Sequence, residues 1–185
     1  METRVFPRFA VLGAGHGGTA MAGHLSLMGF DVSLYNRGAD RLNPIRVAGG
    51  VEILSDCAES VPYGFARLDV VTTDPAEAIR ERQILMVVVP ATAHAFIAEQ
   101  IAPHLVDGQV VVLNPGRTGG ALEVHRVIRD KGCRADVVVA EAQTFIYASR
   151  SVNPAQTRIF RIKNSIPVAA LPAHRTPEVV KLLRH

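Results

Sequence analysis

The chain has few cysteines, no long apolar run and no concentrated block of positive charge, and each absence excludes a class of protein. Its two cysteines, Cys57 and Cys133, stand far apart and outside any Cys/His ligand spacing, which excludes a disulfide framework and a zinc site. No stretch approaches the about 20 apolar residues that cross a bilayer. The first apolar run, at 9–12, is too short for a secretory signal peptide. We therefore expect a cytoplasmic protein that binds neither a membrane nor a metal.

The basic residues outnumber the acidic ones only slightly and are spread along the chain. The net charge is +3 and the isoelectric point is about 9.2, a balance that suits an anionic ligand. Scattered Lys and Arg residues do not predict nucleic-acid binding. A hydrophobic content of 48% with 20% charged residues is that of an ordered globular protein. The length of 185 residues predicts one domain, 1–185, with its own core.

Strand-like and helix-like patterns alternate along most of the chain. The predicted strands cover 9–12, 31–35, 51–54, 63–68, 70–72, 84–89, 110–113, 137–140, 158–163 and 168–171. The predicted helices cover 17–29, 41–48, 92–105 and 121–131, and further helices start near Asp74 and Thr176. This order predicts an α/β fold: a Rossmann-type, doubly wound, mostly parallel sheet with an antiparallel edge.

Two parts of the pattern interrupt the simple alternation. The stretches 51–54 and 63–68 are typical of a hairpin inserted between sheet strands. The strict alternation of 158–163 predicts an edge or hairpin strand, which we expect to pair near 168–171.

The most informative motif is a glycine-rich turn directly behind the first strand. It reads Gly13-Ala14-Gly15-His16-Gly17-Gly18 and has the spacing G-x-G-x-x-G of dinucleotide-binding proteins. Gly13 allows the tight turn, Gly15 lets the backbone approach a pyrophosphate, and Gly18 lets the helix pack closely. The N–H groups at the helix start face the phosphates, and His16 is placed to contact the cofactor. The alternative is a turn whose glycines have a structural role only.

The end of the second strand indicates which cofactor binds. An NAD enzyme usually carries Asp or Glu there, bonding the adenosine ribose, whereas this chain has Asn36 followed by Arg37. Asn36 does not repel a 2′-phosphate and Arg37 can pair with one, so the sequence favours NADP(H) over NAD(H). NAD(H) remains the alternative, with Arg37 in solvent and Asp40 bonding the ribose.

Further candidates follow the later strands, because ligands bind beyond the carboxyl ends of a doubly wound sheet. Pro90 and Asn114 through Gly116 are expected to flank the nicotinamide ribose. The second glycine-rich turn, 114–120, either holds an anionic group or only starts a helix, with Thr118 as its N-cap.

The residues Glu141, Gln143 and Thr144 are expected to face a substrate cleft. Glu141 follows a buried strand at the ligand edge; its alternative is a buried structural ion pair. None of the seven histidines stands beside an obvious carboxylate partner, so no catalytic histidine is assigned to this chain.

These motifs resemble the octopine/nopaline (opine) dehydrogenase family, in which they occur in the same order. The motifs are Gly13-Ala14-Gly15-His16-Gly17-Gly18, Val88-Val89-Pro90-Ala91, Asn114-Pro115-Gly116-Arg117-Thr118-Gly119-Gly120-Ala121-Leu122-Glu123, Glu141 through Tyr147-Ala148-Ser149-Arg150, and Ala169-Ala170-Leu171-Pro172-Ala173. The resemblance covers essentially the whole chain. The stretch 114–123 is its most specific part, because generic Rossmann proteins lack it.

The resemblance implies an oxidoreductase that reduces the imine formed between an α-keto acid, often pyruvate, and an amino acid, using NADH or NADPH. It also implies a C-terminal, mainly helical catalytic domain that carries the proton-donating histidine and its partner aspartate. No such domain lies within 1–185, so we expect the cofactor-binding half of a longer enzyme, inactive alone, with a homodimer as a possible assembly. The alternatives are the cofactor domain of a ketopantoate- or glycerol-phosphate-type dehydrogenase and a stand-alone nucleotide-sensing module.

Overall fold

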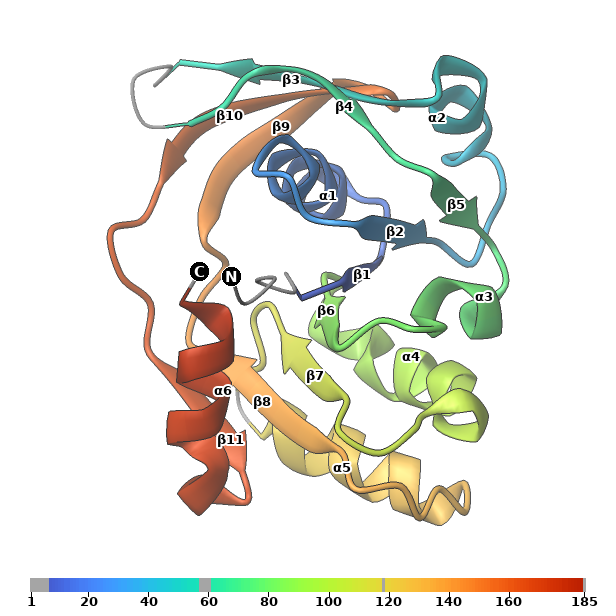
Figure 1. The fold of residues 1–185 in the computed structure, drawn as a ribbon, viewed down its shortest axis with the longest axis vertical. Coiled ribbons are helices and arrows are strands. Elements are labelled where there is room, and N and C mark those ends of the chain that lie inside the picture. Colours follow the sequence, from blue (N-terminus) through green and yellow to red (C-terminus); the bar gives the residue numbers. More distant parts are fainter. Residues whose placement is uncertain (1–6, 57–60, 118, 185) are drawn as a thin grey trace, which may run out of the picture.

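A seven-stranded sheet forms the centre of the computed structural model, which describes residues 7–56, 61–117 and 119–184 (Figure 1). The strand order is β11-β8-β7-β6-β1-β2-β5. The strands are β1 (Phe9–Leu12), β2 (Val32–Tyr35), β5 (Val70–Thr72), β6 (Ile84–Val87), β7 (Val110–Leu113), β8 (Val138–Ala142) and β11 (Val168–Leu171). All neighbours pair in parallel except β11 with β8. The predicted doubly wound, mostly parallel sheet with an antiparallel edge is therefore confirmed.

The central strands are buried on both faces, as their continuous apolar sequences indicate. In β1, Val11 packs into one core cluster and its neighbours Ala10 and Leu12 into the other. The same alternation holds in β7, where Val110 and Val112 face the first cluster and Val111 and Leu113 the second. Two separate hydrophobic cores, one on each face, therefore hold the sheet in place.

The helices cover both faces of this sheet. Their bounds are α1 (His16–Leu27), α2 (Asn43–Ala48), α3 (Pro75–Ile79), α4 (His94–Ile101), α5 (Gly120–Asp130) and α6 (Thr176–Leu183), with 3₁₀ turns at Ala91–Ala93, Ala102–His104 and Ala173–Arg175. Residues of α3, α4 and α5 pack into one core cluster, and residues of α1, α2 and α6 into the other. Asp74 caps α3 as its sequence predicts, since its Oδ1 accepts a 2.9 Å bond from the Ala76 N–H. The predicted helix 92–105 is instead an α-helix between two 3₁₀ turns, the second of which contains Pro103.

A second sheet of four strands lies on the far side of α1. It has the order β4-β3-β10-β9 and consists of β3 (Gly50–Ser55), β4 (Gly64–Arg67), β9 (Tyr147–Asn153) and β10 (Gln156–Ile162). Figure 1 shows α1 enclosed between the two sheets. A Cβ on Gly23 of this helix would lie 2.4 Å from the Ile53 side chain of β3, so the small residues of α1 permit close packing on both sides.

The second sheet confirms one sequence prediction and corrects another. The stretches 51–54 and 63–68 form a hairpin inserted between β2 and β5, as predicted, and β3 also pairs in parallel with β10. The strand at 158–163 belongs to a hairpin with β9 as predicted, yet it lies inside the second sheet rather than at an edge. It does not pair near 168–171, since β11 adds to β8 of the larger sheet. Alternation along one strand reveals its two faces but not its partners.

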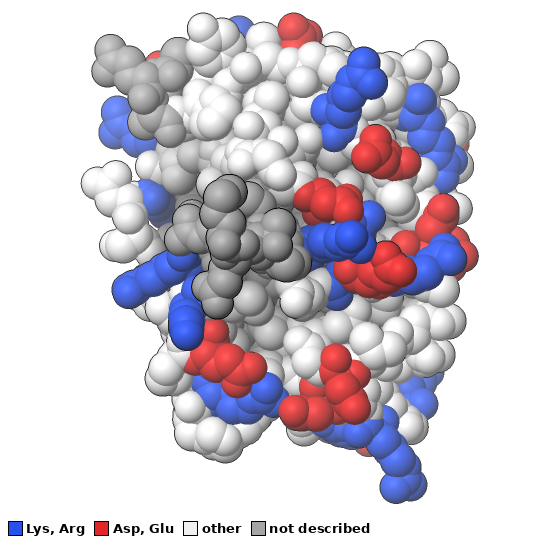
Figure 2. All heavy atoms as spheres, viewed as in Figure 1, with Lys and Arg blue, Asp and Glu red and all other residues white. Residues whose placement is uncertain are grey.

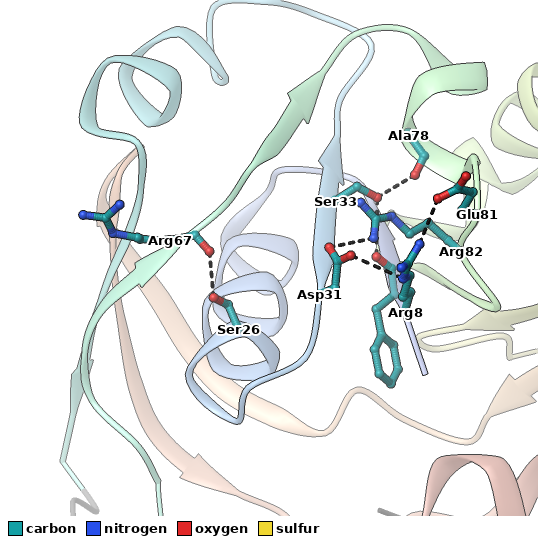
Figure 3. A network of polar contacts seen from close by, with 9 residues as sticks. Arg8, Ser26, Asp31, Ser33, Arg67, Ala78, Glu81 and Arg82 are labelled. Atoms are coloured by element: carbon teal, nitrogen blue, oxygen red, sulfur yellow. Dashed lines mark hydrogen bonds and ion pairs between the residues drawn. The ribbon is translucent and has the colours of Figure 1, made fainter. Parts of the chain in front are cut away.

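An ion-pair network closes the amino ends of the central strands, opposite the ligand edge (Figure 3). Asp31 bonds the guanidinium of Arg82 at 2.6 Å and lies 3.6 Å from that of Arg8. Arg8 also pairs with Glu81 at 2.8 Å. These residues precede β1, β2 and β6, so the network joins three strand starts and leaves the carboxyl ends for other contacts.

On the face drawn in Figure 2, basic and acidic side chains are interspersed. Within the part of the chain that the structure describes, no helix is long and apolar enough to cross a membrane.

Candidate functional site

The glycine turn lies where β1 ends, at the point where the strand order reverses. β1 pairs with β2 on one side and β6 on the other, and such a reversal opens a crevice at the carboxyl ends of the strands. Gly13 has φ +121°, and a Cβ there would lie 2.4 Å from the Val88 carbonyl oxygen. A Cβ on Gly18 would lie 1.6 Å from the Gly13 carbonyl oxygen. The turn therefore requires glycine at both positions.

Gly15 differs from these two glycines. Its backbone is extended, with φ −77° and ψ −173°, a conformation that any residue adopts. No heavy atom lies within 4 Å of the Cβ position. The space beside Gly15 is therefore open, and it lies at the N-cap of the 12-residue helix α1. An open cradle at a helix N-terminus fits the pyrophosphate of a dinucleotide.

Two residues of the motif contact the second half of the chain. The Nδ1 atom of His16 accepts a 3.1 Å hydrogen bond from the backbone N–H of Ser151 in β9. A Cβ on Gly17 would lie 2.7 Å from the ring of Phe145, so this second-half aromatic residue lies directly over the helix start. The G-x-G-x-x-G spacing does not require glycine at position 17, and the sequence alone gave no reason for it. The Phe145 ring is that reason.

At the end of β2, Asn36 and Arg37 have different roles. The Asn36 Oδ1 accepts a 3.3 Å bond from the Ala14 N–H, and its Nδ2 donates a 2.9 Å bond to the Gly38 carbonyl. Asn36 thus braces the glycine turn itself. The exposed Arg37 guanidinium lies 5.9 Å from the centre of the Phe96 ring, in the range of a cation–π contact. The Phe96 ring of α4 thus lies close to the positive charge that follows the carboxyl end of β2.

The second glycine-rich turn surrounds a carboxylate of the chain itself. The Oε2 atom of Glu141 accepts a 3.0 Å bond from the Ala121 N–H in the first turn of α5. A Cβ on Gly116 would lie 2.0 Å from the Glu141 Cβ, which explains that glycine. The Glu141 carboxylate therefore lies at this helix start, where it accepts a hydrogen bond from a backbone N–H of α5. The alternative predicted for Glu141 is a buried structural ion pair, whereas the structure shows its carboxylate bonded to this backbone N–H. The N-cap of α5 is Gly119 with φ +84°, while Thr118 lies outside the described residues.

Glu141 and Gln143 line a cavity of about 430 Å³ together with Arg117 and Pro167. The Gln143 residue is exposed, and its backbone N–H donates a 3.0 Å hydrogen bond to the Pro167 carbonyl. Thr144 lies next along the chain, and its Oγ1 accepts a 2.7 Å bond from the Lys163 ammonium group. The structure thus brings these predicted cleft residues to one edge of the sheet and adds a cation, Lys163, that sequence reasoning missed.

Pro90 and Asn114 follow the neighbouring strands β6 and β7 but differ in exposure. Pro90 is exposed and precedes the 3₁₀ turn at Ala91–Ala93. Asn114 is 7% exposed, and its Nδ2 donates a 2.9 Å bond to the Val112 carbonyl. The Asn114 side chain is therefore fixed in place at the carboxyl end of β7.

Two histidines, the half-buried His24 of α1 and the buried His94 of α4, have shifted pKa values. Burial lowers the pKa of His24, whose Nδ1 is 2.9 Å from the Tyr147 hydroxyl oxygen, and burial raises the pKa of that hydroxyl. Burial also lowers the pKa of His94, although the carboxylates of Glu123 and Glu141 oppose the shift. His94 is 1% exposed, and neither of its ring nitrogens has a hydrogen-bond partner among the described residues. Both rings are therefore disposed to stay neutral.

These two histidines should make the fold sensitive to acid. Below the ordinary histidine pKa of 6.5 the unfolded chain binds protons that the folded rings resist, so the free energy of unfolding falls as pH decreases. Each ring contributes a slope of at most about 1.4 kcal/mol per pH unit. We expect His94→Leu to reduce this slope and the exposed control His104→Leu to leave it unchanged. Urea unfolding between about pH 8 and pH 5 measures both, and equal slopes in the two variants would contradict the assignment.

Residues 8–139 match the family model of the N-terminus of NAD-dependent glycerol-3-phosphate dehydrogenase. The chain belongs to this family of nucleotide-binding domains. An opine dehydrogenase of Arthrobacter sp. (strain 1C) is 37% identical over 166 residues, which is 89% of this chain and 45% of that protein. The predicted resemblance to opine dehydrogenases is thus confirmed. The chain spans less than half the length of this curated relative.

Solved structures of opine dehydrogenases share the fold. An octopine dehydrogenase solved with NADH and L-arginine superposes with a TM-score of 0.81 at 20% identity, over 97% of this chain and 46% of that one. A yersinopine dehydrogenase with NADP+ bound gives a TM-score of 0.77 at 19% identity, over 96% of this chain and 45% of that one. At these identities the likeness shows a common fold.

Proposed function

We propose that this chain is the cofactor-binding half of an opine-dehydrogenase-like enzyme, which reduces the imine of an α-keto acid and an amino acid with NADPH in preference to NADH. The observation that carries the proposal is the open glycine turn at the strand-order reversal, in a chain 37% identical to an opine dehydrogenase. When bound, the cofactor would supply the hydride. The residues of this chain would bind and orient it.

The contacts described above support a division of roles along the crevice. The N–H groups at the start of α1 and the open space at Gly15 would hold the pyrophosphate. Arg37 would pair with the adenosine end, Asn36 would keep the turn in shape, and Asn114 would lie beside the nicotinamide ribose. Pro90 and Gly116 lie at the same edge of the sheet, and we assign them to the cofactor site as well.

The substrate side would be formed by the segment that follows β8. Glu141 is held by the Ala121 N–H, and Thr144 is bonded to Lys163. A fixed carboxylate suits an amino or imine nitrogen, and an ammonium group suits the carboxylate of a keto acid. Gln143 lines the adjoining cavity and would complete this wall.

We expect NADPH to bind about tenfold more tightly than NADH, because a charge-assisted contact with a 2′-phosphate contributes about 1.5–3 kcal/mol. Arg37→Ala should abolish this preference, whereas Arg126→Ala on the exposed side of α5 should not change it. Calorimetric titration of both nucleotides into each variant measures the effect. If NADH binds to the unmutated chain as well as NADPH, the preference is wrong and Asp40 is left to bond the ribose.

We expect residues 1–185 alone to bind nucleotide without condensing keto acids with amino acids. Imine reduction needs an acid near the hydride acceptor and a closed cleft that aligns the substrate. No described histidine here is held by a carboxylate, so the acid would come from elsewhere. NADPH oxidation with pyruvate and a panel of amino acids tests this. Amino-acid-dependent turnover by the chain would contradict the two-domain proposal.

The family model also favours a second candidate, a glycerol-phosphate-type dehydrogenase. The full-length protein separates the two candidates, because imine reduction depends on an added amino acid, whereas reduction of dihydroxyacetone phosphate does not. Nucleotide binding without turnover of either kind by the full-length protein would favour a nucleotide-sensing module.

A further inference from the structure

The second sheet holds the first residue of α1 in one chemical form. The backbone N–H of Ser151 can only donate, so the Nδ1 atom of His16, 3.1 Å away, must accept. An accepting Nδ1 carries a lone pair and no proton. In the neutral ring the proton therefore sits on Nε2, and a doubly protonated ring would lose the bond to Ser151. A residue 135 positions away in sequence thus sets the tautomer of this histidine.

A second strand of this sheet, β10, helps to fix the backbone of the turn. The Thr19 hydroxyl donates a 3.0 Å bond to the Gly15 carbonyl and lies 2.8 Å from the Thr157 hydroxyl of β10. Thr19 is 1% exposed and Thr157 is fully buried. With its one proton given to Gly15, the Thr19 oxygen accepts from Thr157. Hydroxyls from α1 and from the second sheet therefore anchor the turn that carries His16.

We propose that the Nε2–H of His16 donates to the pyrophosphate of the bound dinucleotide, and that Ser151 of β9 is the positioning residue that orients it. This rests on the proposed function. His16 is exposed at the N-terminus of α1, beside the open space at Gly15. Its Nδ1 is engaged by β9, and Nε2 lies across the ring from that bond. An N–H donor with a fixed direction, added to the backbone N–H groups of the helix start, stabilises a bound anion without requiring a charged ring.

A competing explanation is that His16 only satisfies a free amide of an edge strand, since β9 ends the second sheet. Two substitutions separate the explanations. In His16→Asn the amide oxygen can replace Nδ1 as the acceptor for Ser151, but no donor reaches the Nε2 position. In His16→Gln the side chain can reach the Nε2 position, but the acceptor at the Nδ1 position is lost.

We expect His16→Asn to keep the thermal midpoint of the unmutated chain while its affinity for NADPH and NADH falls about tenfold. His16→Gln should have part of that affinity restored. The exposed control His104→Asn should bind both nucleotides normally. Titration calorimetry on the full chain gives the affinities. Unchanged affinity in His16→Asn would overturn the proposal and leave the proposed function intact. Failure of the unmutated chain to bind either nucleotide would overturn both.

The tautomer gives a second readout that does not depend on activity. In ¹⁵N-histidine NMR spectra of the free chain, we expect His16 to show a protonated Nε2 and an unprotonated Nδ1. Addition of NADPH should shift the Nε2 resonance more than the Nδ1 resonance. A proton on Nδ1, or a ring that does not respond to saturating NADPH, would overturn the proposal.

Discussion

Gly15→Val should abolish nucleotide binding and leave the chain folded. The backbone of Gly15 is extended, which valine adopts readily, and no atom lies within 4 Å of the Cβ position, so the free protein has room for the side chain. The isopropyl group would then fill the space in which we propose that the pyrophosphate lies. Losing two charge-assisted hydrogen bonds costs about 3–6 kcal/mol, or more than a hundredfold in affinity.

Calorimetry with NADPH and a thermal unfolding curve test both parts of this prediction on the same sample. A midpoint close to that of the unmutated chain, with no detectable binding, is the expected pair of results. Equal affinity in the variant would show that the pyrophosphate does not lie at Gly15. A large fall in the midpoint would show that the open space beside Gly15 is needed by the fold itself.

Gly18→Ala should have the opposite profile, a large loss of stability. A Cβ there would lie 1.6 Å from the carbonyl oxygen and 2.7 Å from the carbonyl carbon of Gly13, and these backbone atoms cannot move aside without breaking the turn. Within a helix, replacing glycine with alanine ordinarily stabilises by about 0.5–1 kcal/mol. Here we expect a loss of about 3 kcal/mol or more, which lowers the thermal midpoint by roughly 6–12 °C.

Differential scanning calorimetry measures this loss, and Gly23→Ala is a useful comparison within the same helix. Its added Cβ would meet side-chain atoms of Ile53 rather than backbone atoms, and a side chain can shift more easily than the backbone, so the loss should be smaller. A midpoint in Gly18→Ala that equals or exceeds that of the unmutated chain would contradict the close contact between α1 and the turn.

The local elements around the site could be predicted because each depends on short-range chemistry. Gly13 and Gly18 allow a turn that other residues would block, and the apolar run at β6 indicates a strand buried on both faces. Asp74 as the N-cap and Pro75 as the first helical residue start α3 through local chemistry alone. These features required no knowledge of distant residues, and the structure confirms them.

The contacts that could not be predicted are those that join residues distant in the sequence. Glu141 is held by an N–H of α5, and His16 by an N–H of β9. Gly17 is small because Phe145 lies over it. No spacing in the sequence relates the two members of any of these pairs. Each contact forms only when the fold brings together elements that are separate in the chain.

The sequence by itself determined the parallel sheet and the glycine turn at the end of β1, because periodicity and glycine spacing are local properties of the chain. The family was indicated by the resemblance of the chain's longer motifs to those of opine dehydrogenases. Only the tertiary structure decided that β3, β4, β9 and β10 form one sheet over α1, that the Glu141 carboxylate is bonded at the start of α5, and which nitrogen of His16 carries the proton. Strand partners and hydrogen-bond partners are chosen by the whole fold, since any strand with a free edge and any free donor can pair with several others.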